Sequence, residues 1–194
     1  MNLPNKLTLL RILLIPVFML FAAARLWGYA PWCYLAAALV FAAASFTDFL
    51  DGYLARKWHM VTDFGKFADP LADKILTTTA FLYMLADGVC HPVVLVVILA
   101  REFAVSGVRM VAAGAPGGRV IAANLWGKAK TVLQMATILA YYFGLAVLTR
   151  GGGLGEEAVF YTVVHGLCWL VALATLVSGV QYIWQNRQFV NTAK

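Results

Sequence analysis

The fold is decided by residues 31–56, which read PWCYLAAALVFAAASFTDFLDGYLAR. This stretch contains no charged side chain before Asp48. A helix that crosses a lipid bilayer needs about 20 mostly apolar residues. We therefore expect a transmembrane helix whose last turns carry two carboxylates, those of Asp48 and Asp51.

The whole chain has the same apolar character. Of its 194 residues, 62% are hydrophobic and 12% are charged, and the mean hydropathy is +0.79. Soluble domains are about 45–50% apolar and about 25% charged. This composition excludes a disordered chain, most soluble folds and a nucleic-acid-binding protein. The formal net charge of +6 is instead typical of basic loops that face anionic membrane lipids.

Six apolar stretches predict an all-α, polytopic membrane protein with a single domain over residues 1–194. A short polar segment at residues 2–11 is expected to lie at the membrane interface. Gly and Pro residues separate the stretches. The predicted spans are residues 7–26, 31–56, 67–86, 92–112, 130–148 and 159–184.

Basic residues predict the orientation of the chain. With this span order, twelve of the fifteen Lys and Arg residues fall on the side of the N-terminus, Arg25 and Arg150 fall on the other side, and Arg101 lies inside a span. Basic loops face the cytoplasm. Both termini are therefore expected to be cytoplasmic, in a plasma (inner) membrane, although an organelle membrane is an alternative.

Five of the nine acidic residues lie within residues 48–73. Asp48 and Asp51 are three residues apart at the end of the second span, and Asp69 and Asp73 are four apart at the start of the third. Each pair therefore shares one face of a helix. The turn between the spans brings both pairs to the same membrane surface, whereas Asp63 is out of phase and is interpreted as part of a solvated rim.

Four neighbouring carboxylates repel one another unless cations lie between them. Oxygen ligands without His or Cys suit Mg²⁺, Mn²⁺ or Ca²⁺ rather than Zn²⁺. Four carboxylates are enough for two ions that hold a phosphoryl group. Gly52 and Ala55 leave room for a bulky ligand, and Arg56 offers a planar donor to phosphate. The alternative, in which basic neighbours simply neutralise these acids at a helix rim, does not explain two phased pairs.

The same residues resemble the signature of the CDP-alcohol phosphotransferases, which they match at all eight specified positions. In order, they are Asp48-x2-Asp51-Gly52-x2-Ala55-Arg56-x8-Gly65-x3-Asp69-x3-Asp73. The resemblance covers 26 residues and also agrees with the six spans. It implies a metal-dependent enzyme that transfers the phosphatidyl group of a CDP-linked lipid to an acceptor hydroxyl and releases CMP.

The resemblance also implies roles for individual residues. Mg²⁺ or Mn²⁺, as two divalent ions, would be held by Asp48, Asp51, Asp69 and Asp73. Asp73 would also be the general base on the acceptor hydroxyl. The CDP-lipid would contact Asn5, Thr8, Gly52, Ala55, Arg56 and Thr62. A homodimer packed through its membrane helices is implied as well.

Two further stretches indicate the acceptor. Residues 101–109, with Arg101, Glu102 and Arg109, and residues 127–131, with Lys128 and Lys130, resemble the fourth and fifth spans of the phosphatidylglycerophosphate synthases of this family. The implied substrates are CDP-diacylglycerol and glycerol 3-phosphate. Arg109, Lys128 and Lys130 would bind the acceptor phosphate, although the two lysines are also typical of membrane anchors.

Other acceptors stay open, namely those of phosphatidylserine, phosphatidylinositol phosphate and cardiolipin synthases. Outside this family, intramembrane acids are also found in cation transporters. A transport site is expected near the membrane midplane, whereas the acids here gather at one face, which disfavours transport. A purely structural subunit would leave the acidic pairs unexplained.

Overall fold

The computed structural model describes residues 3–23, 27–57, 63–114, 125–151 and 154–187, with side chains except at 3–5, 49, 51–57, 63–70, 113–114 and 154. These residues form six α-helices, which confirms the all-α prediction. The helices are α1 (Leu3–Ala22), α2 (Pro31–Lys57), α3 (Asp63–Ala86), α4 (Pro92–Gly114), α5 (Leu125–Gly151) and α6 (Leu154–Gln185).

Proline and glycine set several helix ends. Pro31 and Pro92 are the first residues of α2 and α4, where the missing N–H costs nothing. Gly88 follows the end of α3 with a φ of +76°, a left-handed conformation that glycine adopts without strain. Its neighbour Val89 donates a backbone hydrogen bond of 2.9 Å to Met84, which closes the end of the helix.

The helices differ from the predicted spans mainly at their polar ends. Residues 3–11, which belong to the segment expected at the interface, form the first part of α1 and continue into its apolar turns without a break. α5 begins at Leu125, five residues before the predicted span. Apolar length marks what a bilayer covers, whereas a helix also continues through polar turns outside it.

Three of the described segments are long and apolar enough to cross a membrane. They are Pro31–Asp48, Leu125–Gly151 and Gly155–Gln185. These segments support the membrane assignment for α2, α5 and α6. For the other three helices, spanning stays a prediction.

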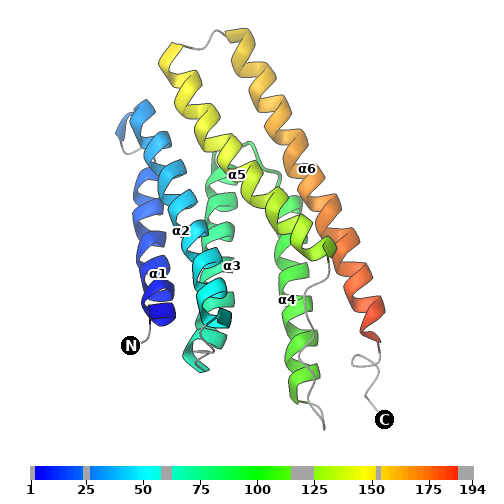
Figure 1. Cartoon of the computed structure of the whole chain (residues 1–194). Helices are drawn as coiled ribbons and strands as arrows, with labels where there is room; N and C mark the ends of the chain where they lie inside the picture. Colours follow the sequence, from blue (N-terminus) through cyan, green and yellow to red (C-terminus); the bar gives the residue numbers. More distant parts are fainter. Residues whose placement is uncertain (1–2, 24–26, 58–62, 115–124, 152–153, 188–194) are drawn as a thin grey trace.

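The six helices alternate in direction, so that both ends of the described chain lie at one end of the molecule (Figure 1). We call this the terminal end; it also contains the end of α2, the start of α3 and the end of α4. The opposite end, with the α3–α4 and α5–α6 connections, is called the distal end. α1 packs on α2 and α3, α5 packs on α2 and α6, and α4 packs on α6.

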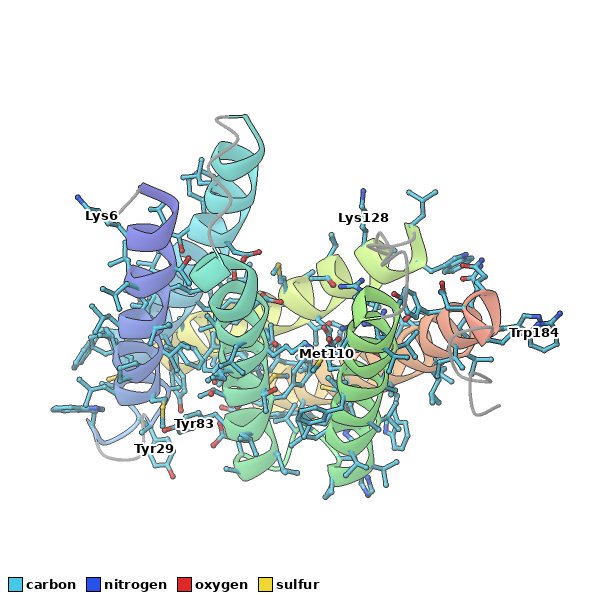
Figure 2. All side chains as sticks on the ribbon, turned by 90° about the horizontal axis from the view of Figure 1, so that it is seen from below. Lys6, Tyr29, Tyr83, Met110, Lys128 and Trp184 are labelled. Carbon is cyan, nitrogen blue, oxygen red and sulfur yellow. The ribbon has the colours of Figure 1, made fainter. Side chains whose placement is uncertain are left out.

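Apolar side chains fill the space between the helices and also cover the outside. Phe18, Phe41 and Phe81 are fully buried in the core. Gly144 of α5 lies directly against the ring of Phe160, so the absence of a side chain there lets α5 and α6 approach closely. Large apolar residues such as Trp184 also point outward from the bundle (Figure 2), as expected for a surface in contact with lipid.

Candidate active site

The ends of α2 and α3 that carry the aspartates lie next to each other at the terminal end (Figure 1). Asp48 and Asp51 lie on the last turns of α2, and Asp69 and Asp73 lie on the first turns of α3. The predicted meeting of the two helix ends is thus confirmed. The side chains of Asp48 and Asp73 are described, whereas those of Asp51 and Asp69 lie outside the described side chains.

Asp48 is paired with an arginine of another helix. Nη1 of Arg11, on α1, lies 2.7 Å from Oδ1 of Asp48. The Arg11 side chain is completely buried, whereas that of Asp48 is 37% exposed. Thr8 lies one turn earlier on α1 and is also fully buried. α1 therefore supplies a buried cation to the aspartate site, and Asp48 keeps a solvent-facing side.

Asp73 lies between charges of both signs. Its carboxylate interacts electrostatically with Asp48 and Glu102, and with the cations Arg11 and Lys130. Asp48 and Asp73 thus repel each other across the α2–α3 interface. This is the like-charge arrangement that the spacing predicted, and it becomes favourable when cations are close by.

A second charged group lies beside Asp73 and joins three helices. Glu102 of α4 accepts hydrogen bonds at Oε1 from Lys130 of α5 and, at 3.2 Å, from Arg101. Lys74 of α3 lies 4.0 Å from Glu102 Oε2 and donates to the backbone oxygen of Glu102 at 3.3 Å and to Ser106 Oγ. We call Lys74, Arg101, Glu102 and Lys130 the Glu102 cluster.

The three predicted acceptor-binding cations do not share one environment. Lys130 is 3% exposed and belongs to the Glu102 cluster. Arg109 lies about 10 Å beyond Glu102 along α4. Its Nε donates to the hydroxyl of Tyr182 at 3.2 Å, and its guanidinium packs on that ring. Lys128 is exposed and points away from the neighbouring helices (Figure 2). Of these three cations, only Lys130 is among the groups that act electrostatically on Asp73.

Comparison with known proteins identifies the family. A model of the CDP-alcohol phosphatidyltransferase family matches residues 1–183. The chain belongs to this family. It is 40% identical over 200 residues to the CDP-diacylglycerol–glycerol-3-phosphate 3-phosphatidyltransferase of Bacillus subtilis, covering 99% of this chain and 98% of that protein. The proteins of the same name from Pseudomonas fluorescens (39% over 201 residues; 100% and 90% covered) and Escherichia coli (34% over 186 residues; 94% and 93%) are also similar.

Membership in the CDP-alcohol phosphatidyltransferase family makes this protein a transferase and confirms the resemblance inferred from the signature. Several of the residues predicted from the family resemblance have no described side chain; they are Asn5, Asp51, Gly52, Ala55, Arg56 and Asp69, and Thr62 lies wholly outside the described residues. Among the described side chains, no three His, Cys, Asp or Glu residues gather as a metal site. The roles assigned to the predicted metal and CDP-lipid residues therefore stay predictions.

The sequence alone does not assign two cationic residues, Arg11 and Lys74, to the candidate site. The sequence places Arg11 in the segment expected at the membrane interface, and Lys74 only among the basic neighbours that could neutralise the acids at a helix rim. A signal existed for Arg11, because a charged residue within the apolar run 7–22 needs a buried partner. Arg101 and Glu102, which lie inside a predicted span, pair with other charges in the Glu102 cluster, as charged residues in a membrane require.

Proposed function

We propose that the protein transfers the phosphatidyl group of CDP-diacylglycerol to sn-glycerol 3-phosphate, producing phosphatidylglycerophosphate and CMP. The observation that carries this proposal is the position of Asp48 and Asp73 beside a buried, mostly cationic cluster. The carboxylates suit a reaction at a diphosphate, and the cations suit an acceptor that carries a phosphate of its own. The names of the similar bacterial proteins support the same substrates.

The donor set fits divalent cations. The described carboxylates of Asp48 and Asp73 are hard oxygen ligands on adjoining helices, and Asp51 and Asp69 occupy the neighbouring turns. Two ions, Mg²⁺ or Mn²⁺, held by these four residues would offset the repulsion between them. When bound, such ions neutralise charge that develops on the diphosphate.

The residues of the chain would act at defined atoms. Asp73 accepts the proton of the acceptor hydroxyl as its oxygen attacks the phosphorus of the phosphatidyl group. The bond between that phosphorus and the bridging oxygen breaks, and CMP leaves with that oxygen. Arg56 would offset negative charge on the leaving group. Gly52, Ala55, Asn5, Thr8 and Thr62 would line the CDP site.

The acceptor phosphate would lie toward Lys130, the cation nearest to Asp73 among the three proposed for this role. Arg109 and Lys128 would contribute more weakly, because Arg109 packs on Tyr182 and Lys128 faces outward. We assign the terminal end to the cytoplasmic face of a plasma membrane, and a homodimer as the assembly. The orientation follows from the distribution of basic residues. The homodimer follows from the family resemblance.

The acceptor assignment is tested by incubating the purified protein with CDP-diacylglycerol, Mg²⁺ or Mn²⁺ and a panel of acceptors. We expect CMP release with glycerol 3-phosphate and little release with serine, inositol phosphate or phosphatidylglycerol. Release with one of these three, and none with glycerol 3-phosphate, would overturn the assignment. Loss of activity after chelation, and recovery after reloading, tests the requirement for metal.

A further inference from the structure

Among the described side chains, Glu102 is the only carboxylate in its cluster, and it faces three cations. Lys74 comes from α3, Arg101 from α4 itself and Lys130 from α5. Counted over the described side chains, the cluster therefore has two positive charges in excess, in a region where Lys130 and Arg101 are 3% and 11% exposed. An excess of buried charge is costly unless a further anion joins it.

Asp73 competes with Glu102 for these cations. It directly precedes Lys74 in the chain, and its charge also acts on Lys130. Lysine side chains are long and rotate freely, so a lysine ammonium turns toward whichever carboxylate is available. In the structure, Lys130 is hydrogen-bonded to Glu102 and Lys74 to the backbone of Glu102 and to Ser106.

We propose that Glu102 is a positioning residue that holds Lys130 and Lys74 away from Asp73. Asp73 is thereby left to bind a divalent ion and to accept a proton, and the two ammonium groups are left to receive an acceptor phosphate. This inference rests on the proposed function, because it concerns the same site. Glu102 itself touches neither substrate.

The substitution Glu102→Gln keeps the size of the side chain but removes its charge. Lys130 would then pair with Asp73, which places a positive charge where a divalent ion must bind. Binding of Mn²⁺ should weaken roughly tenfold or more, since like charges this close repel strongly outside bulk water. The KM for glycerol 3-phosphate should also rise, because the ammonium groups no longer meet the phosphate together.

The experiment measures Mn²⁺ binding to the metal-free full-length protein in detergent, by calorimetry and by the electron paramagnetic resonance signal of free Mn²⁺. The variants are Glu102→Gln, Lys130→Gln and the double variant. The matched control is Glu156→Gln, which makes the same chemical change at an exposed position of α6 at the distal end. The thermal transition of each variant is recorded alongside.

The double variant separates positioning from a purely structural role. Without an ammonium at position 130, Lys130 no longer competes with the divalent ion for the Asp73 carboxylate. The Mn²⁺ affinity should therefore return to within about threefold of the wild type. The KM for glycerol 3-phosphate should stay raised. If Glu102→Gln binds Mn²⁺ as tightly as the wild type, or if the double variant does not recover, the positioning role is wrong.

A failure of the proposed function gives a different result. If the wild-type protein takes up no Mn²⁺, the metal-dependent mechanism is wrong, and the role of Glu102 falls with it. If Glu102→Gln does not fold, Glu102→Asp replaces it, because its carboxylate is one methylene farther from Lys130. That variant should bind Mn²⁺ about threefold more weakly, and unchanged binding would overturn the inference.

Discussion

The two ends of the bundle both contain hydrogen-bonded or paired polar side chains, but the partners differ in kind. At the distal end, the Tyr141 hydroxyl donates to Asp87 Oδ2 at 2.7 Å, and His165 bonds to the backbone oxygen of Val89 at 3.0 Å. Trp169 donates to the second ring nitrogen of His165, also at 3.0 Å. At the terminal end, by contrast, several like charges share partners around Asp48, Asp73 and Glu102.

This difference indicates which end of the bundle has a structural role and which end has a binding site. A neutral donor that meets one acceptor contributes modestly to stability and needs nothing further. Adjacent carboxylates and surplus cations inside a membrane protein are costly, and such groups usually mark a site for a ligand. We therefore expect the distal end to hold helices together and the terminal end to bind substrates and ions.

The largest expected effect comes from making one substitution at each end. Asp73→Asn removes the proposed base and a metal ligand, so turnover should fall about 10³-fold or more while CDP-diacylglycerol still binds. Asp87→Asn makes the same change at the distal end, where the side chain keeps an acceptor oxygen for Tyr141. Its turnover should stay within about twofold of the wild type. Turnover is measured as CMP release, and the affinity for CDP-diacylglycerol is measured by equilibrium binding.

Near-normal turnover in Asp73→Asn would show that Asp73 is not the base. A large loss in Asp87→Asn with the fold intact would show that the distal end takes part in the reaction. Either result would break the division between the two ends.

The second effect concerns the buried ion pair at the terminal end. Arg11→Gln removes the guanidinium beside Asp48 and leaves that carboxylate facing Asp73. Losing one partner of a buried pair costs about 3–5 kcal/mol, and because Asp48 is partly exposed we expect about 2 kcal/mol of stability to be lost. Thermal unfolding in detergent measures this loss. Arg150→Gln, at an exposed distal position, is the control and should unfold like the wild type.

The Arg11 variant also tests what stabilises the aspartate site. Saturating Mn²⁺ should restore more of the thermal stability in Arg11→Gln than it adds to the wild type, because the ion replaces a missing cation. Equal stabilisation of both proteins would mean that Arg11 and the ion do not act on the same carboxylates.

The third effect is confined to stability. Tyr141→Phe removes the hydroxyl that bonds to Asp87, and Tyr141 is almost fully buried. We expect a loss of about 1 kcal/mol and unchanged kcat and KM. A changed KM for glycerol 3-phosphate would connect the distal end to the acceptor site and contradict the comparison.

The sequence was sufficient for the parts of the fold that depend on local rules. Pro31 and Pro92 mark helix starts, and the spacing of Asp48, Asp51, Asp69 and Asp73 indicates one shared site at two helix ends. Both depend on residues close together in the chain. Helical periodicity and the apolar length of a span predict them without knowledge of the other helices.

Helical periodicity and apolar length do not predict contacts between segments that are far apart in the chain. The pairing of Arg11 with Asp48 joins residues 37 positions apart, and that of Glu102 with Lys130 joins residues 28 apart. Spacing gives the face of a helix but not the helix that packs on it. For the same reason Lys128 and Lys130 were assigned together, although two residues along a helix turn them to different sides.

The smallest expected effect follows from that difference between neighbouring lysines. Lys128→Ala removes an exposed cation and should raise the KM for glycerol 3-phosphate less than about twofold. Lys130→Ala removes the buried cation that pairs with Glu102 and should raise the KM about tenfold or more, because a buried phosphate contact is far less screened than an exposed one. Measuring both at low and high salt sharpens the test, since only the small Lys128 effect should vanish as ionic strength rises. Equal effects of the two substitutions would mean that the phosphate lies outside the bundle, near the start of α5, rather than next to the Glu102 cluster.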